Sequence, residues 1–230
     1  MAEPPYKIIA QHFSALQGKI CLLYGTKEVY SLATSLTAEF LGLSETVVCI
    51  DGANRVDPYA LSKIARIHLV DPYTYLDRVY VSRAYTCYQL DVSITDGLFD
   101  FLRSVGARIL LIYGLINLFD DDQVPDMDIV DILRRVRQAL VHLKANGISV
   151  LLVSSYPHFH LKRREEYFKH MMLMSDVHYR LETDDTSQHT FIEESCNGKN
   201  NTDGNHAYPI RAKQLVTIPP RAAERRPADL

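Results

Sequence analysis

The sequence predicts an α/β fold built on a mainly parallel central sheet with helices on both faces. The first observation is a set of five apolar runs, rich in Ile, Leu and Val, that lack the alternation of half-buried strands. The second is the helical pattern between these runs, which gives the strand–helix order typical of parallel sheets. The five predicted strands are residues 19–24, 46–51, 78–82, 108–113 and 149–154.

The predicted helices alternate with these strands. They are residues 7–17, 28–42, 58–68, 88–105, 127–146 and 161–174. The fifth has the clearest boundaries, because Asp126 can cap its start and Asn146 followed by Gly147 is a typical stop. From about residue 176 the pattern alternates like a strand, and residues 191–193 can pair with it. We expect one domain over residues 1–194, a flexible loop over 195–206, a last strand within 207–218 and a disordered tail over 219–230.

Composition sets limits on the function. The chain has 230 residues, 47% of them hydrophobic, and a formal net charge of −3, so any contact with nucleic acid must come from a local basic patch. The four cysteines form no C-x-x-C pair, which favours reduced thiols in a cytosolic compartment. The first residues do not read as a signal peptide, and no apolar stretch approaches the roughly 18 residues of a membrane span. We expect a cytoplasmic protein, or a nuclear one if the source is eukaryotic, without a membrane partner.

A degenerate phosphate-binding loop follows the first predicted strand. Nucleotide-binding domains carry G-x-x-x-x-G-K-[ST] between a strand and a helix. Here Tyr30, Ser31 and Leu32 replace the second glycine, the lysine and the hydroxyl that binds Mg²⁺. Lys27 is either an exposed lysine of the first helical turn or, in a deviant loop, a phosphate ligand. A further interpretation is that the segment is an ordinary strand–helix turn, which would also contain a glycine. The positions of the degenerate loop are Gly25, Thr26, Lys27, Tyr30, Ser31 and Leu32.

Three segments carry a family resemblance. Residues 71–85 read DPYTYLDRVYVSRAY, residues 47–52 read VVCIDG, and residues 175–182 read SDVHYRLE. They are similar to three stretches of RecA/RadA-type recombinases and their paralogues: "GLDP…VLDRIYVARAY", the second core strand ending in Asp, and the strand "ADV…RLE". The resemblance covers roughly residues 15–185, and the 71–85 segment is its most specific part. It implies a RecA-like three-layer core.

The same resemblance implies that the catalytic positions are lost. The family's general base falls at Ala53, which cannot orient a water molecule. The strand that should end in a Mg²⁺-binding carboxylate ends in Tyr113, and the polar sensor falls at Tyr156. We therefore expect a pseudo-ATPase with no catalytic residues, no metal site and no cofactor.

Tyrosines stand at the ends of several apolar runs. Tyr24, Tyr113 and Tyr156 end three of them, and Tyr30 lies in the degenerate loop. Because ligands of open α/β sheets bind outside the carboxyl ends of the strands, these rings could fill the space of a nucleotide. The alternative is that they take part in helix–sheet packing elsewhere.

Other candidate residues have weaker patterns. Asp120, Asp121 and Asp122 are either a metal cluster or, as we favour, a solvated acidic loop. The basic segment at Lys162, Arg163 and Arg164 is the candidate DNA-binding site, with aromatic residues nearby for stacking on bases. His158 and His160 are a weak candidate metal pair. Tyr73, Tyr75, Tyr80, Tyr85 and Tyr88 are expected in core or interface packing, and Arg134, Arg135 and Arg137 as surface charges.

Taken together, the residues and the resemblance favour a non-catalytic RecA-like accessory protein. It would act as an adaptor or scaffold in homologous recombination or DNA repair. Its expected partner is another RecA-like protein, in a homo- or hetero-oligomer, and single-stranded DNA is a second candidate partner. Two alternatives stay open: an ATPase with a deviant loop that uses Lys27 with Asp51 or Asp120, and a KaiC-like regulatory or structural module without a nucleic-acid role.

Overall fold

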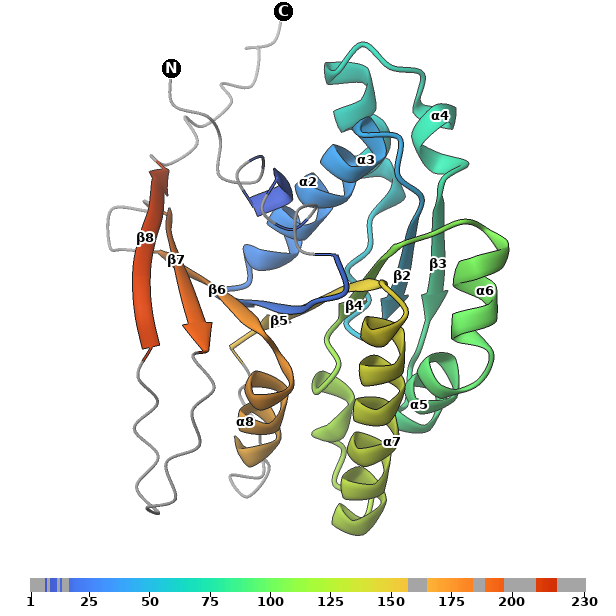
Figure 1. Cartoon of the computed structure of the whole chain (residues 1–230), viewed down its shortest axis with the longest axis vertical. Coiled ribbons are helices and arrows are strands. Elements are labelled where there is room, and N and C mark those ends of the chain that lie inside the picture. The colour runs from blue at the N-terminus through green and yellow to red at the C-terminus, as the bar shows by residue number, and fades with distance from the viewer. Residues whose placement is uncertain are drawn as a thin grey trace, which may run out of the picture.

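The chain folds around one eight-stranded sheet with the spatial order β3-β2-β4-β5-β1-β6-β7-β8. The computed structural model describes residues 7, 9–11, 13, 17–156, 165–183, 189–196 and 210–218. The first six strands of this order are parallel, and β7 and β8 add to β6 in antiparallel pairing (Figure 1). The strands are β1 Ile20–Gly25, β2 Val47–Asp51, β3 Val79–Arg83, β4 Ile109–Tyr113, β5 Ser149–Ser155, β6 Val177–Thr183, β7 His189–Cys196 and β8 Ile210–Ile218.

Two sets of helices cover the two faces of the sheet, which confirms the predicted α/β three-layer architecture. Buried residues of one face pack with α2 (Val29–Gly42), α3 (Pro58–Ile67) and α4 (Pro72–Leu76). Buried residues of the other face pack with α5 (Cys87–Thr95), α6 (Leu98–Ser104), α7 (Asp126–Ala145) and α8 (Glu165–Met174). A short 3-10 helix, η1 (Asn117–Phe119), follows β4.

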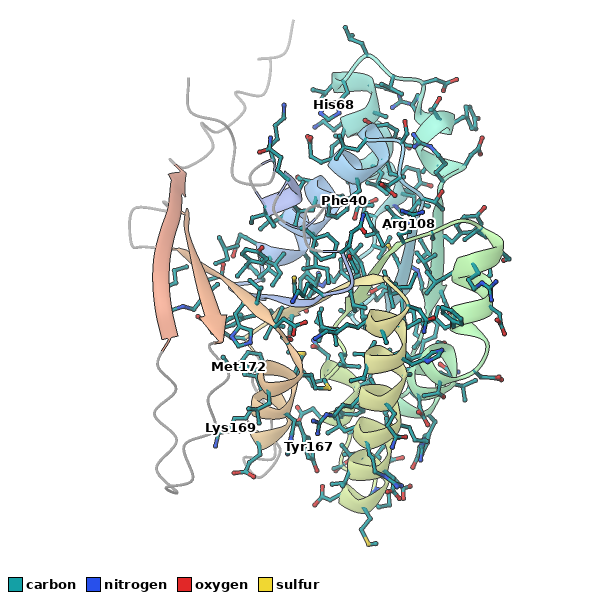
Figure 2. The ribbon with its side chains drawn as sticks, viewed as in Figure 1. Phe40, His68, Arg108, Tyr167, Lys169 and Met172 are labelled. Carbon is teal, nitrogen blue, oxygen red and sulfur yellow. The ribbon has the colours of Figure 1, made fainter. Side chains whose placement is uncertain are left out.

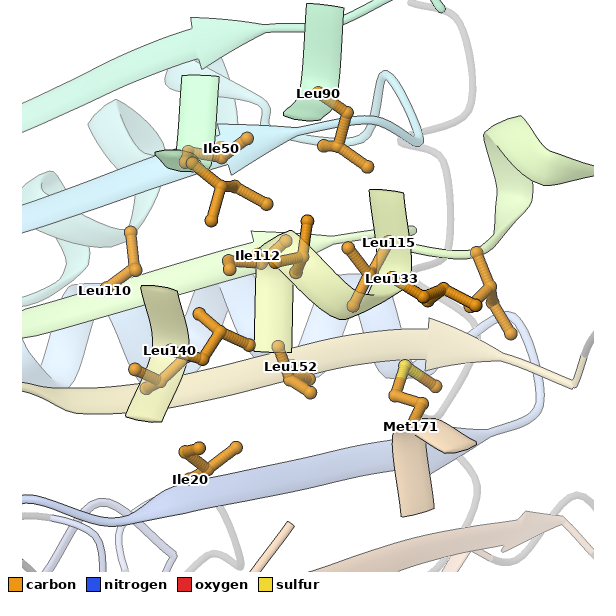
Figure 3. Close-up of a cluster of buried hydrophobic side chains, with 14 of the residues drawn as sticks. Ile20, Ile50, Leu90, Leu110, Ile112, Leu115, Leu133, Leu140, Leu152 and Met171 are labelled. Carbon is orange, nitrogen blue, oxygen red and sulfur yellow. The ribbon is translucent and has the colours of Figure 1, made fainter. Parts of the chain in front are cut away.

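The parallel strands are apolar throughout because both of their faces are buried. Ile50, Ile112 and Leu152 face the α5–α8 layer and pack with Leu133 and Leu140 of that layer (Figure 3). The alternate residues of the same strands face the α2–α4 layer. This two-sided burial explains why the strands lack polar alternation.

Aromatic contacts fix helices on both faces. Phe40 lies on α2 (Figure 2), and its ring packs against that of Phe13 with centroids 5.3 Å apart. On α8, Tyr167 packs against Phe119 of η1 at 6.2 Å. Aromatic pairs of this kind add to the stabilisation that area burial gives.

Some predicted boundaries were wrong. The single helix expected over residues 88–105 is two helices, because Gly97 adopts a φ of +70° between them. Asp126 is the first residue of α7 rather than its cap, and Pro125 precedes it. Helix α4 was not predicted; Asp71 caps it by accepting a hydrogen bond from the Tyr73 amide.

At the two ends of the chain the description is partial. Strand β7 continues to Cys196, two residues into the range predicted as a loop, and β8 lies within the range predicted for a last strand. Residues 197–209 and 219–230 lie outside the described residues. None of the helices in the described part of the chain has the length and apolar character to cross a lipid bilayer.

Candidate functional site

The carboxyl ends of β1, β4 and β5 meet where a parallel sheet would bind a nucleotide. Strand β1 lies between β5 and β6, so Gly25 at its end is enclosed on both sides. Gly25 has a φ of +146°, and a Cβ built on it would lie 2.0 Å from the carbonyl oxygen of Leu181. The glycine is therefore required by the close approach of β6, independently of any phosphate.

The turn after Gly25 is short, and three backbone amides in and just after it donate to protein carbonyls. The Thr26 amide donates to Leu181 O at 3.3 Å, and the Val29 amide donates to Thr26 O at 3.0 Å. The Tyr30 amide donates to Lys27 O at 3.4 Å, and α2 begins at Val29 without a side-chain cap. A phosphate cradle needs several amides that point together at the ligand, and these three amides point at protein carbonyls.

The predicted loop side chains do not converge. Lys27 and Ser31 are exposed, Thr26 and Leu32 are half-buried, and Tyr30 is buried on the first turn of α2. Arg55 places its guanidinium carbon 5.5 Å from the centre of the Tyr30 ring. A cation therefore covers the tyrosine at the position where a P-loop would have its second glycine.

Two tyrosines fill the volume beneath α2. Tyr30 stacks on Tyr113 with ring centroids 6.4 Å apart and an angle of 20° between the rings. The Tyr30 hydroxyl accepts a hydrogen bond from the Ser155 amide at 3.3 Å, and the Tyr113 hydroxyl lies 3.5 Å from Thr37 Oγ1. Burial, reinforced by Cys49 and Asp51, raises the pKa of Tyr113 well above its ordinary value. This pair corresponds to the predicted tyrosine plug.

The other two tyrosines behave as the alternative prediction states. Tyr24 lies on the opposite face of the sheet and packs against Phe168 of α8 at 5.5 Å and against His178 at 6.5 Å. Tyr156 is 38% exposed and meets the edge of Tyr24 at 5.8 Å, while its amide donates to Gly25 O at 2.6 Å. The plug is therefore made of two of the four rings.

Asp51 is fully buried at the end of β2, and its carboxylate organises the next turn. Its oxygens accept hydrogen bonds from the amides of Arg55 and Val56 at 2.9–3.0 Å. Ala53, at the position expected for a general base, lies against Gly114: a Cβ on Gly114 would be 2.6 Å from the Ala53 Cβ. A metal ion would have to compete with the amides of this turn for Asp51, so its geometry is that of a structural carboxylate.

The acidic loop after β4 and the basic segment are the two remaining candidate sites. Asp121 accepts a hydrogen bond from the Gln123 amide at 3.0 Å, and Asp121 and Asp122 are exposed. Within the described residues, no group of three or more metal-ligating side chains is brought together. The candidate DNA-binding residues Lys162, Arg163 and Arg164, together with His158 and His160, lie outside the described residues.

Sequence reasoning missed a partly buried ion pair between α5 and α7. Asp91 is 7% exposed, and its Oδ2 accepts a hydrogen bond from Arg135 Nε at 3.1 Å. Arg135 is exposed, as predicted for a surface charge, and it also pairs with Asp91. The only signal for this pair in the sequence was the carboxylate of Asp91 within an apolar helical pattern, together with an arginine on the next predicted helix.

A second feature that the sequence did not reveal is a groove beside β3, the edge strand of the sheet. The groove has a volume of about 410 Å³ and lies between β2 and β3 and the start of α6. Tyr80 and Val81 of β3 are 38% and 39% exposed, and Tyr80 packs edge-on against Phe101 at 5.4 Å. The lining residues are Val48, Ile50, Tyr80, Val81, Leu98 and Phe101, with Ser82, Ser93, Asp96 and Gly97.

The predicted aromatic strip divides between core and surface. Tyr75 is 2% exposed, as expected for core packing, and its hydroxyl lies 3.2 Å from His68 Nδ1. Tyr73, Tyr85 and Tyr88 are exposed, and Tyr88 donates a hydrogen bond to Asp128 at 2.7 Å. This hydrogen bond raises the pKa of Tyr88 to about 12.

Comparison with known proteins gave no family model that matches this chain and no matching curated protein.

Proposed function

We propose that this chain is a non-catalytic RecA-like accessory protein that serves as an adaptor or scaffold in homologous recombination or DNA repair. The observation that carries the proposal is the closed carboxyl edge of the sheet. The amides of Thr26, Val29 and Tyr30, in and just after the turn that follows β1, donate to carbonyl oxygens, and Tyr30 stacks on Tyr113. A site packed in this way stabilises the domain without a ligand, and the domain then acts through its surfaces.

The edge of the sheet at β3 is the surface we assign to the partner. One side of β3 pairs with β2, and among the described residues no strand pairs with its other side. A free strand edge can accept an extended segment of another protein by hydrogen bonding of the main chains, while a neighbouring groove takes an apolar side chain. The β3 edge and the groove beside it offer both elements. The partner would be another RecA-like protein that presents such a segment.

The first experiment tests the closed site. Purified protein is titrated with ATP and with ADP, each with Mg²⁺, and the melting temperature is measured. We expect no saturable shift, because the lysine and hydroxyl that compensate a triphosphate are replaced by Ser31 and Leu32. A saturable stabilisation that disappears in Lys27→Ala would instead support the ATPase with a deviant loop.

The second experiment tests the adaptor role. The protein is mixed with an active recombinase and single-stranded DNA, and filament assembly is followed with and without Val81→Glu. The wild-type chain should change assembly, and Val81→Glu should abolish the change because it puts a charge on the edge strand β3. Val141→Glu is the matched control, since Val141 is 52% exposed on α7, away from the groove. The role is wrong if the wild-type chain leaves assembly unchanged.

Direct contact with DNA is tested separately. A triple variant, Lys162→Ala with Arg163→Ala and Arg164→Ala, is compared with wild type in gel-shift assays on single-stranded DNA at low salt. Backbone-driven binding should weaken in the variant and fade for wild type as salt rises. Equal binding by the two proteins would exclude this segment as the DNA contact, and no binding by either would favour a KaiC-like module.

A further inference from the structure

The groove beside β3 has apolar walls that come from both the sheet and α6. Val48 and Ile50 of β2 form one wall, and Leu98 and Phe101 of α6 form another. Figure 1 shows α6 beside β3, the strand at the end of the sheet, and Phe101 contacts Tyr80 of that strand. Because alternate side chains of a strand point to the same face, a segment paired with β3 brings some of its side chains to this groove.

Three polar side chains also line the groove: Ser82, Ser93 and Asp96. Ser82 is level with Ile50 of β2, so it faces the same side of the sheet as that apolar wall. Asp96 follows the last residue of α5, and its amide donates to Val92 O at 2.9 Å. In the described part of the chain, no hydrogen bond or ion pair engages the side chains of these three residues.

The charge of the groove favours one kind of side chain. Asp96 is the one charged residue among the described residues that line the groove, and its carboxylate is exposed to water in the free chain. A bound segment with only apolar side chains would cover part of this carboxylate without giving it a partner, which costs free energy. An acidic side chain would be repelled. The groove therefore suits a side chain that has an apolar stem and a positive end.

We propose that the groove recognises a lysine or arginine of the segment that pairs with β3. This inference rests on the proposed function, which supplies the segment and its strand-like pairing. The methylene stem lies against the apolar walls, the charged end pairs with Asp96, and the hydroxyls of Ser82 and Ser93 accept its remaining hydrogens. Main-chain pairing at β3 gives affinity that does not depend on sequence, and the cationic side chain adds specificity.

The test uses a short strand-forming peptide, acetyl-Thr-Val-Thr-Xaa-Thr-Val-Thr-amide, in which Xaa is lysine, norleucine or glutamate. Binding to the isotope-labelled full chain is measured by NMR at low salt, from the amide signals of β3 and of the junction between α5 and α6. Norleucine has an unbranched stem like that of lysine but no charge. Comparing wild type with Asp96→Asn for both peptides therefore isolates the ion pair.

Asp96→Asn should weaken binding of the lysine peptide by about three-fold or more, the size expected of a solvent-exposed ion pair, and should leave the norleucine peptide unchanged. Asp96→Lys should reverse the preference, from the lysine peptide to the glutamate peptide. Rising salt should remove the difference between wild type and Asp96→Asn. Asp100→Asn is the matched control, because Asp100 is exposed in the first turn of α6 but does not line the groove.

Equal weakening of the lysine and norleucine peptides in Asp96→Asn overturns the proposal, because the loss would then come from the strand pairing and not from the ion pair. Unchanged binding of both peptides also overturns it, and so does the absence of amide shifts with every peptide at millimolar concentration. None of these results decides the adaptor role, which is judged by recombinase assembly with wild type and Val81→Glu. A preference for lysine without an effect on assembly would end the adaptor role and leave the specificity of the groove standing.

Discussion

Two regions of the parallel sheet, the carboxyl ends of β1, β2 and β4 and the edge strand β3, differ in the contacts that their polar and aromatic groups make. At the carboxyl ends of β1, β2 and β4, hydrogen bonds join turns to neighbouring strands, and two stacked tyrosines occupy the remaining space. At β3, one edge is unpaired within the described part of the chain, and a groove of about 410 Å³ lies beside exposed Tyr80 and Val81. The first region is closed and the second is open.

This difference predicts which substitutions should lower the stability of the fold and which should weaken the binding of a partner. Groups in the closed region make hydrogen bonds and ring contacts within the fold, so changing them should destabilise the protein. Groups at β3 make fewer contacts within the fold, so changing them should affect partners and leave stability nearly intact. The following four predictions test this contrast, from the largest expected effect to the smallest.

Gly25→Ala should have the largest effect on stability. A Cβ at this position would lie 2.0 Å from Leu181 O, a backbone atom that cannot move without displacing β6. We expect a loss of about 4 kcal/mol or more in the free energy of unfolding, measured by urea denaturation. Gly106→Ala is the matched control, because Gly106 has a φ of +67° and nothing lies within 4 Å of an added Cβ.

Gly106→Ala measures the free-energy cost of placing alanine at a positive φ where no atom clashes with its Cβ. Gly106→Ala should lose only about 1 to 2 kcal/mol. If both variants lose the same amount, the close approach of β6 is not what requires Gly25, and a role of this glycine in ligand binding regains weight.

Asp51→Ala should be the second most costly change. The substitution leaves the Arg55 amide and the buried Val56 amide without their acceptor, and each orphaned donor costs about 1 to 3 kcal/mol. Because Arg55 is exposed and water can replace its acceptor, we expect a total loss at the lower end, about 2 to 3 kcal/mol, in chemical denaturation. Asp57→Ala removes a carboxylate that also accepts from two amides but at an exposed helix cap, and it should cost only about 1 kcal/mol. Equal losses would mean that the turn after β2 is not held by burial of Asp51.

Tyr113→Phe should be nearly neutral at pH 7 and should change the alkaline limb of the stability curve. Its hydroxyl is 3.5 Å from Thr37 Oγ1, which also donates to Ala33 O, so we expect less than about 1 kcal/mol at neutral pH. Burial raises the pKa of Tyr113 above the ordinary value of 10.0. The stability linked to this group is therefore fully present below pH 10 and is lost as the pH rises above it.

The measurement is the melting temperature between neutral and alkaline pH. Wild type should lose stability above pH 10 more steeply than Tyr113→Phe. Parallel alkaline limbs for the two proteins would show that the hydroxyl is accessible to water, and the plug would then be more open than its 1% exposure indicates.

The sequence predicted the layers of the fold because their signals are local. The apolar runs without alternation identified β1 to β5 to within one or two residues, since buried parallel strands need no polar face. The helix break at Gly97 was missed because the surrounding apolar pattern continues through it. The break depends on the positive φ of Gly97. A glycine allows this backbone conformation but does not require it, so the residue type alone does not predict the break.

The candidate site was predicted in part, for a related reason. The sequence identified Tyr24 and Tyr113 as residues that end strands, but the face each ring occupies depends on register between strands. Tyr113 is level with Val153 and faces α2, whereas Tyr24 is level with Ser154, one residue further along β5, and faces α8. The groove beside β3 was not predictable either, because its lining comes from strands and helices that are distant in the sequence.

Val81→Glu should have the smallest effect on stability and is the sharpest test of the contrast. Val81 is 39% exposed on an edge strand, so the substitution removes little buried apolar area and adds a charge that water can reach. Surface changes of this kind alter the free energy of unfolding by about 0.5 kcal/mol or less. We expect unfolding in urea to be unchanged within that range, together with loss of the effect on recombinase assembly that we propose for the wild-type chain. A loss of stability comparable to that of Asp51→Ala would mean that the β3 side is as tightly packed as the carboxyl edge, and the distinction between a closed and an open region would fail.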